Sequence, residues 1–241
     1  MSKAATIAQL KKELLPLNGY REKHRHESLN AVLGPIVHAF PGASFPLDAV
    51  HEFVAKSEEE AAVSAAFISS VLAAMMQPHG TAIWISAGCN IFPQALLRMG
   101  VAPHQIIFVQ LEKDKDILWT MEEALKCEGL AAVIANVKEL SFTASRRLQL
   151  AVEQSQVTGF VLRQQARNIA ATACVTRWQV TSLPSELPTQ LPGVGYPRWR
   201  VNLQKVRNGR PGSWEVSCGP NGLRHVYRNA SLQPIPQKQT G

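Results

Sequence analysis

The stretch from Ala49 to Met76 constrains the fold of this chain more than any other. It begins with a short apolar run, Ala49–Ala55, which is typical of a buried β-strand. It ends with 16 residues, Ala61–Met76, that are apolar on almost every side and predict a buried helix. Between them lies a tight polar turn, in which Ser57 is a candidate N-cap and Glu60 follows three residues later. This strand–turn–helix unit predicts a domain of the α/β class.

The turn has the position of a phosphate-binding loop but lacks its chemistry. Such a loop binds phosphate through backbone N–H groups, with glycines for close approach, a lysine directed at the phosphates and a Ser or Thr for magnesium. Residues 54–63 contain no glycine, and Lys56 precedes the turn. Three carboxylates at the positive end of the helix favour the helix dipole themselves and would repel a triphosphate. The turn residues of this degenerate nucleotide site are Lys56, Ser57, Glu58, Glu59 and Glu60.

Strands and helices continue to alternate after the first helix, which predicts a mainly parallel sheet flanked by helices. The predicted strands are 81–86, 106–111, 130–137 and 159–162. The predicted helices are 92–99, 114–127 and 143–154. An antiparallel C-terminal extension is predicted beyond them, because three further segments alternate between apolar and polar residues and are joined by turns rich in proline and glycine. These segments are 171–182, 198–207 and 213–218.

The pattern divides the chain into three parts. Residues 1–40 form a helical segment and linker, residues 41–228 form the core with its antiparallel extension, and residues 229–241 are expected to be disordered. Within the first part, residues 3–17 predict a short amphipathic helix. This helix docks either on a partner or on the chain's own core.

Several classes of protein are excluded by composition. No apolar run reaches the roughly 18 residues that a membrane span requires, and no export signal precedes the domain. Four cysteines, without a C-x-x-C pair, are expected to be buried small hydrophobes: Cys89, Cys127, Cys174 and Cys218. The histidines form no metal-binding motif. We therefore expect a cytoplasmic protein without a metal or cofactor.

Charge is distributed unevenly along the chain. Residues 1–140 carry 12 Lys and Arg against 15 Asp and Glu, whereas residues 141–241 carry 13 against 3. Arginine supplies 11 of those 13 cations and is suited to planar contacts with phosphate or carboxylate. This asymmetry indicates an acidic partner, either nucleic acid or an acidic protein surface. The alternative is a solvated basic face that only aids solubility.

Short segments across most of the chain carry a family resemblance. In chain order they are Phe45-Pro46, Ala49–Phe53, Trp84-Ile85, Ile117–Trp119, Met121–Leu125, Thr143–Leu150, Thr176–Trp178, Pro197–Val201 and Gly209–Trp214. The order of elements over roughly residues 45–218 resembles the core of the RecA recombinase. More closely, the segments resemble the ImuA family, RecA-related accessory proteins of bacterial damage-induced mutagenesis. The cell-division inhibitor SulA belongs to the same wider group and is matched less well.

Comparison with RecA implies that the catalytic groups are lost. The strand that would end in the catalytic glutamate ends here in Ala87-Gly88-Cys89, and the Walker B aspartate position falls at Asn136. Together with the altered turn, these changes argue against ATP hydrolysis, because phosphoryl transfer depends on positioning and charge stabilisation. We expect no catalytic residues and no enzymatic activity.

The resemblance also suggests where DNA or a partner could bind. Arg163, Gln164 and Arg167 follow the strand that in RecA leads to a DNA-binding loop, or they merely cap the sheet. Arg146 and Arg147 lie on a predicted helix and bind either an acidic patch or neighbouring glutamates. Four arginines complete the candidates in the basic C-terminal region: Arg198, Arg200, Arg207 and Arg210. The five tryptophans are expected to be mostly core residues.

By resemblance, we expect a non-catalytic adaptor of damage-induced translesion synthesis. Its implied partners are an ImuB-like homologue of Y-family polymerases and an error-prone DnaE-type polymerase, with RecA and DNA as further candidates. The alternatives are a DNA-stimulated ATPase with degenerate motifs and a SulA-like inhibitor of cell division. Resemblance in fold alone does not decide between them.

Overall fold

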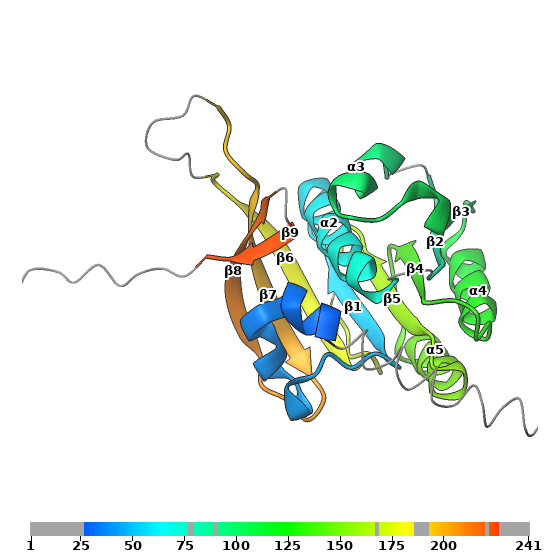
Figure 1. The fold of residues 1–241 in the computed structure, drawn as a ribbon. Coiled ribbons are helices and arrows are strands. Elements are labelled where there is room, and N and C mark those ends of the chain that lie inside the picture. Colours follow the sequence, from blue (N-terminus) through cyan, green and yellow to red (C-terminus); the bar gives the residue numbers. More distant parts are fainter. Residues whose placement is uncertain are drawn as a thin grey trace, which may run out of the picture.

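A single mixed β-sheet organises the protein. The structure, a computed structural model, describes residues 27–76, 80–88, 91–166, 169–185, 193–219 and 222–226. In these residues the sheet has nine strands in the order β3-β2-β4-β5-β1-β6-β7-β8-β9 (Figure 1). The strands are β1 (Val50–Val54), β2 (Ala82–Ser86), β3 (Ile106–Gln110), β4 (Ala132–Val137), β5 (Thr158–Arg163), β6 (Thr176–Leu183), β7 (Arg198–Val206), β8 (Gly212–Gly219) and β9 (Gly222–His225).

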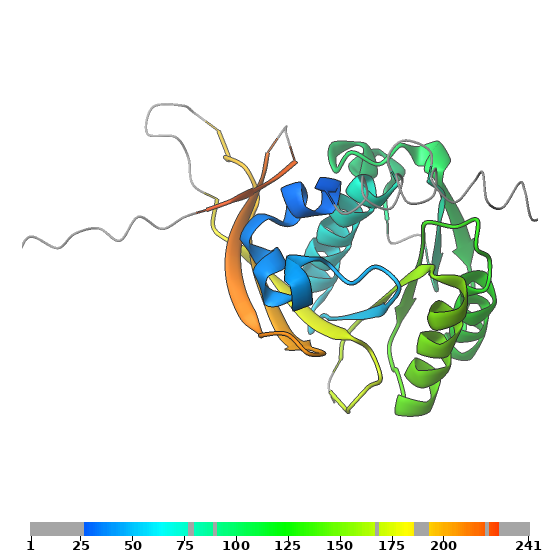
Figure 2. The ribbon, with the colours of Figure 1, turned by 60° about the horizontal axis from the view of Figure 1, so that its bottom comes forward.

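The sheet changes from parallel to antiparallel at β6. The six strands from β3 to β6 in the sheet order run parallel, and Phe53 of β1 lies opposite Leu162 of β5 and Trp178 of β6. From β6 onwards, β7, β8 and β9 pair antiparallel. Figure 2 shows this antiparallel part as a curved extension beside the parallel strands, with the first described residues packed against it. The α/β class with an antiparallel C-terminal extension is therefore confirmed.

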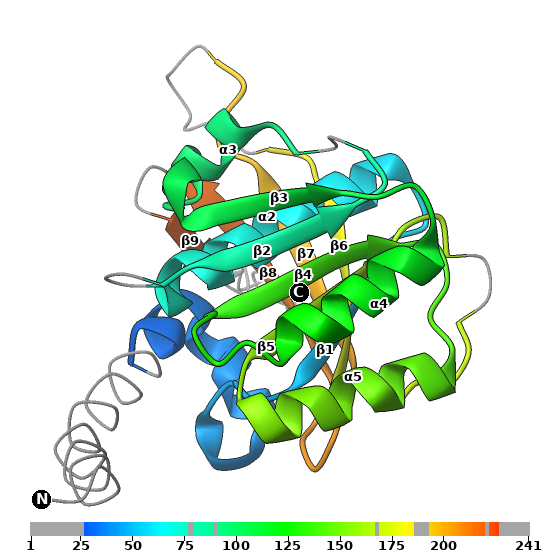
Figure 3. The ribbon, with the colours of Figure 1, turned by 90° about the vertical axis from the view of Figure 1, so that its right-hand side faces the viewer.

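Helices cover the parallel part on both faces (Figure 3). On one face, α4 (Asp114–Leu125) packs on β2 and β4, and α5 (Phe142–Ser155) packs on β1 and β5. On the other face, α2 (Glu58–Met75) packs on β5 and β6. The shorter helices are α3 (Pro93–Arg98), η1 (Gly34–Ala39), η2 (Pro41–Ala43) and η3 (Pro103–Gln105).

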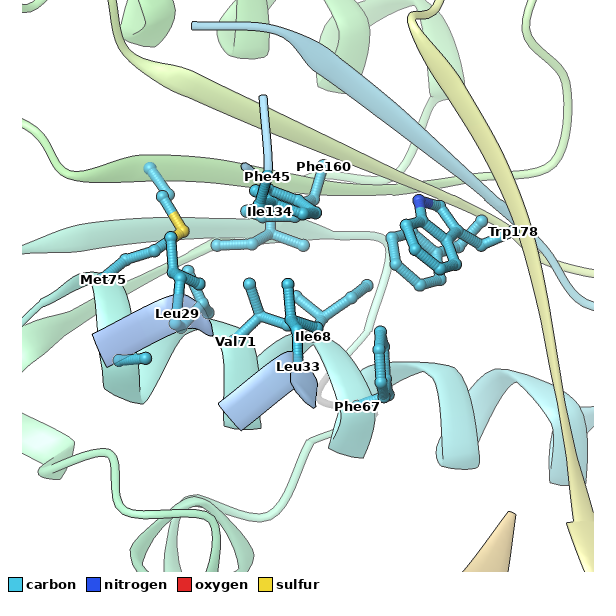
Figure 4. Packing of buried hydrophobic residues seen from close by; sticks show 14 of the residues in the cluster. Leu29, Leu33, Phe45, Phe67, Ile68, Val71, Met75, Ile134, Phe160 and Trp178 are labelled. Atoms are coloured by element: carbon cyan, nitrogen blue, oxygen red, sulfur yellow. The ribbon is translucent and has the colours of Figure 1, made fainter. Parts of the chain in front are cut away.

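The larger core lies under α2. The helix buries residues around most of its circumference, as its uninterrupted apolar sequence predicts. Figure 4 shows Phe67, Ile68 and Val71 of this helix packed with Leu33 and with Trp178. Because residues 27–33 are helical and bury Leu29 and Leu33, the segment before β1 belongs to the same core.

A second core lies between the sheet and α4 with α5. Ile117, Met121 and Leu125 are fully buried at helical spacing on α4, as the sequence predicts. They pack with apolar side chains from the opposite face of the parallel strands. Each face of the parallel sheet is thus covered, which explains why its strands are almost continuously apolar.

A buried chain of hydrogen bonds joins β6, β1 and the segment before β1. Trp178 Nε1 donates to Thr176 Oγ1 at 2.7 Å, and Thr176 Oγ1 lies 2.7 Å from His51 Nδ1. His51 Nε2 lies 2.9 Å from the carbonyl oxygen of Pro46. Because that carbonyl can only accept, Nε2 carries the proton and Nδ1 accepts from the threonine hydroxyl. A neutral His51 therefore satisfies every member of the chain.

Three details of the sequence interpretation need correction. The segment predicted as an antiparallel strand from residue 171 begins as β6 only at Thr176, and β6 runs parallel to β1 while it pairs antiparallel with β7. Strand β9 was not predicted, because it has only four residues. Trp84, Trp178 and Trp199 are buried as expected, but Trp119 is 60% exposed on the outer face of α4. The helix predicted at 3–17 and the tail at 229–241 lie outside the described residues.

Within the described part of the chain, no helix combines the length and apolar character that crossing a membrane demands.

Candidate functional site

The turn between β1 and α2 satisfies its own backbone. Ser57 Oγ accepts a hydrogen bond from the Glu60 N–H at 3.2 Å, and Glu60 Oε2 accepts one from the Lys56 N–H at 2.9 Å. The spacing of Ser57 and Glu60 thus gives a variant of the capping box, in which Glu60 accepts from the N–H of Lys56, the residue before the N-cap; we refer to this pair of hydrogen bonds as the capping box. The N–H groups of Lys56 and Glu60 are therefore used by the turn itself, where a phosphate-binding loop would direct such groups at a ligand.

The three consecutive glutamates have different surroundings. Glu59 accepts a hydrogen bond from the Ser182 hydroxyl of β6. Glu60 also accepts from Gln179 Nε2 of β6, at 3.3 Å to its Oε2 atom. Both carboxylates thus join α2 to a strand that extends beyond the end of β1. Glu58 instead lines a cleft at the C-terminal edge of the sheet.

This cleft lies where the sequence predicts the degenerate nucleotide site. Its volume is about 290 Å³, and the first turns of α2 and the ends of β4 and β5 enclose it. Its lining residues are Ser57, Glu58, Ala61, Ala62, Ala65, Ile91, Asn136, Leu162, Gln164 and Gln165. Wider openings at the same edge include Lys56 on one side and Lys138 with Ser141 on the other. The structure thus brings Ser57, Glu58 and Asn136 together, with Lys56 at the outer opening.

Asn136 is the buried polar group of the cleft. Its side chain is 4% exposed, and its Oδ1 accepts a hydrogen bond from Trp84 Nε1 of β2 at 3.1 Å. Gly88, the other strand-end residue predicted for the degenerate nucleotide site, accepts a hydrogen bond from Ser86 Oγ through its carbonyl oxygen. Neither position offers a charge for magnesium. Among the described residues, no group of three or more His, Cys, Asp or Glu side chains could hold a metal ion.

Glu52 forms the centre of a buried ion cluster that the sequence analysis did not identify. This fully buried carboxylate of β1 accepts from Arg163 Nη1 at 3.0 Å, from Arg177 Nε at 2.8 Å and from Thr172 Oγ1 at 2.7 Å. Two arginines and a hydroxyl are enough to compensate a buried carboxylate. A glutamate inside a buried strand was the available signal, since such a charge requires partners.

Arg163 is therefore corrected as a candidate DNA contact. Its side chain is 4% exposed and bound to Glu52, so it belongs to the interior of the fold. Gln164, the next residue, lines the cleft and is partly exposed. Arg167 lies outside the described residues. The burial of Arg163 agrees with the alternative in which these residues cap the sheet, while a contact by Gln164 stays a prediction.

Cations from β6 and the end of β7 hold the segment that follows β5. Arg177 Nη2 donates to the Ala170 carbonyl at 2.7 Å, and Lys205 Nζ donates to the Thr172 and Cys174 carbonyls at 2.8 and 3.1 Å. Arg207 Nη2 donates to the Ala173 carbonyl at 3.0 Å. Arg207 is exposed, and one of its guanidinium nitrogens anchors this segment, so its binding role stays a prediction.

Four other predicted binding arginines also have side-chain partners within the fold. Arg198 and Arg200 donate to opposite oxygens of Glu215, each at 3.1 Å. On α5, Arg147 pairs with Glu122 of α4 at 2.7 Å, and Arg146 lies 4.0 Å from Glu153. These pairs agree with the alternative in which the helix arginines meet neighbouring glutamates. Arg210 is exposed in the turn between β7 and β8, where its backbone N–H donates to the Ala39 carbonyl.

An apolar surface at the β3 edge of the sheet was also missed. Three apolar side chains, Leu97 of α3 and Ile107 and Phe108 of β3, are each 43–56% exposed. We refer to these three residues as the apolar edge. Helix α3 packs against η3, which leads directly into β3 (Figure 3). An exposed apolar edge strand presents unpaired backbone groups together with apolar side chains, which is typical of a protein interaction surface. The sequence alone could not place β3 at an edge.

Comparison with known proteins supplies the family. No protein-family model matches the chain. Two relatives named Protein ImuA, from Caulobacter vibrioides strains NA1000/CB15N and ATCC 19089/CIP 103742/CB 15, are each 33% identical over 208 residues. Each alignment covers 79% of this chain and 85% of the relative. At this identity and coverage, the chain belongs to the ImuA family.

Proposed function

We propose that this protein is a non-catalytic adaptor in damage-induced mutagenesis, which assembles or targets an error-prone translesion polymerase complex. Membership of the ImuA family carries this proposal. By the resemblance to that family, its partners are an ImuB-like homologue of Y-family polymerases and a DnaE-type polymerase, with RecA as a further candidate. Contacts between proteins, rather than a reaction, would then be its contribution.

The chemistry of the cleft supports a role without catalysis. ATP hydrolysis needs groups that bind phosphate, position magnesium and orient water. Here the turn uses its own N–H groups in the capping box, and a carboxylate occupies the start of α2. By the resemblance to RecA, Asn136 falls at the position where magnesium would need a negative charge, and its amide supplies none.

The apolar edge supports a role in protein contacts. Ile107 and Phe108 expose apolar surface on both faces of an edge strand, and Leu97 of α3 is also exposed. A partner segment that pairs with β3 would satisfy the open edge and cover these side chains. We therefore assign this surface to the ImuB-like partner.

The test is co-purification of the full chain with the ImuB-like protein of the same organism. We expect I107K and F108K to reduce complex formation at least tenfold, because a charge would be buried in the contact. V194K is the matched control, since Val194 is 87% exposed and lies between β6 and β7, away from β3. Wild-type protein that forms no complex would contradict the adaptor role. If I107K, F108K and V194K all bind as well as the wild type, the partner contacts a surface other than the apolar edge.

A further inference from the structure

The enclosed part of the cleft has the opposite charge preference to a phosphate site. Among the described residues that line it, Glu58 is the one charged side chain, and the rest are hydroxyl, amide or apolar. Lys56 enters only at the wider outer opening. Within the described lining, an anion would meet this carboxylate and no lysine or arginine. A cation would meet a partner of opposite sign.

Glu58 differs from the two glutamates that follow it. The carboxylates of Glu59 and Glu60 are bound to Ser182 and Gln179 of β6, and Glu60 also closes the capping box. Glu58 makes neither contact and faces the cleft. Capping of α2 therefore does not depend on the Glu58 side chain, although its charge suits the helix dipole.

The orientation of Asn136 supplies a second, independent observation. An indole N–H can only donate, so the atom of Asn136 that faces Trp84 is the oxygen. The amide nitrogen of this buried side chain is thereby left to the cleft, and it donates to no group in the described residues. Gln164 and Gln165 add side chains that can donate and accept. Such amide groups match the N–H and C=O groups of a peptide backbone.

We propose that the cleft takes a basic peptide segment of a partner protein. The arginine or lysine head of this segment binds Glu58, and its aliphatic stem lies along Ala61 and Ala65. The peptide backbone meets the amides of Asn136 and Gln164. Long cationic side chains commonly pack their stem on apolar surface while the head stays at a polar group. This inference deepens the proposed adaptor function, since it names the chemistry of one partner segment.

The experiment uses the full chain and short peptide probes, so its outcome does not depend on knowing the partner. Binding of Ac-Gly-Arg-Gly-NH2 is followed by NMR shifts of the backbone amides of Ala61, Ala65 and Gln164. The matched probe replaces arginine with citrulline, which has nearly the same shape without the charge. We expect the arginine peptide to bind about tenfold more tightly, as a charge-assisted contact requires. A glutamate peptide should not shift these amides.

Two variants locate the contact. E58Q should remove the preference for arginine over citrulline, whereas E59Q should retain it, because Glu59 is bound to Ser182 outside the cleft. Equal shifts with both peptides, loss of preference in both variants, or no shifts at these amides would overturn the proposal. Spermidine binding as tightly as the arginine peptide would show recognition of charge alone and would also overturn it. The NMR experiment measures binding in the cleft only. A negative result would therefore not contradict the adaptor function, which the co-purification experiment tests separately.

Discussion

Trp84 Nε1 on β2 donates to Asn136 Oδ1 on β4 at 3.1 Å, and both side chains are buried. The two strands are adjacent in the sheet, and Asn136 lies two residues beyond Ile134, which is opposite Trp84. The indole thus fixes the rotation of an amide at the end of a central strand. Because the indole could equally donate to a carboxylate, an aspartate at this position could accept the same hydrogen bond but would bring a negative charge that the amide lacks.

A negative charge at position 136 should weaken the fold. We expect N136D to lower the free energy of unfolding at pH 7 by about 1–3 kcal/mol, since one indole donor does not compensate a buried carboxylate. Burial raises the pKa of such a carboxyl, so the penalty should shrink as the pH falls towards 4. Urea unfolding at several pH values measures this difference. N202D is the control at a half-buried position on β7, where a penalty as large as that of N136D would refute the argument.

MgATP should not stabilise the wild-type protein. A ligand present at about 100 times its Kd stabilises a folded protein by about 2.7 kcal/mol. Because Glu58 lines the cleft and the capping box occupies the turn, we expect no change in Tm with millimolar MgATP, with or without single-stranded DNA. A parallel phosphate-release assay should give no turnover. DNA-stimulated release would favour the degenerate ATPase over the adaptor.

Local patterns in the sequence were sufficient for the parallel part of the fold. Ser57 and Glu60 identify the start of α2, and the spacing of Ile117, Met121 and Leu125 identifies the buried face of α4. These patterns depend on residues within a few positions of each other. The strand after residue 171 was predicted less well, since its parallel pairing with β1 depends on a segment more than 100 residues away.

The candidate site was predicted less completely than the fold. The sequence located the turn and Asn136, because the turn follows a predicted strand and Asn136 lies near the end of another. It could not tell which arginines are free, since an arginine has the same local signature whether its partner is a ligand or a distant glutamate. Arg163 meets Glu52 across 111 sequence positions, and Arg147 meets Glu122 on another helix. Only the tertiary structure separates the binding candidates from internal pairs.

His51 should make the fold sensitive to acid. Burial between Phe45 and Phe160 lowers its pKa from 6.5 to about 3. The unfolded chain therefore binds a proton below pH 6.5 that the folded protein does not, and stability falls as the pH decreases from 6.5 towards 3. Linkage gives a loss of about 2 kcal/mol between pH 7 and pH 5 from this residue. In urea unfolding, the free energy of unfolding of H51Q should fall correspondingly less between pH 7 and pH 5, although H51Q is less stable than the wild type at pH 7. H104Q, at an exposed position, should follow the wild type.

The described cysteines should differ in their reactivity. Cys127 is exposed after α4, whereas burial and the neighbouring Glu52 raise the pKa of the Cys174 thiol to about 12. Burial also raises the pKa of Cys218. Because the thiolate is the reactive form, iodoacetamide at pH 8 should modify Cys127 and spare the other two in the native protein. Peptide mass spectrometry measures this, with urea-unfolded protein as the control. Native modification of Cys174 as fast as Cys127 would contradict the buried position.

Glu52 should be the most sensitive charged position in the fold. Removing one partner of a buried ion pair typically costs about 3–5 kcal/mol, because the remaining charge is left uncompensated. We expect a loss of this size for E52A in urea unfolding, since Arg163 would remain buried and Thr172 would lose its acceptor. E153Q is the control, because Glu153 and Arg146 are both largely exposed, and it should change stability by less than about 0.5 kcal/mol.

A double variant separates the ion pair from general damage to β1. If E52A lowers the free energy of unfolding because Arg163 is left buried without its partner, then E52A/R163A should be more stable than the sum of the two single variants predicts. Loss of the Glu52 contact should also release the segment that Arg177 and Lys205 hold, which hydrogen exchange at Thr172 and Ala173 can detect. Strictly additive effects, with unchanged exchange at these amides, would mean that Glu52 contributes by packing alone and that the cluster does not position the segment after β5.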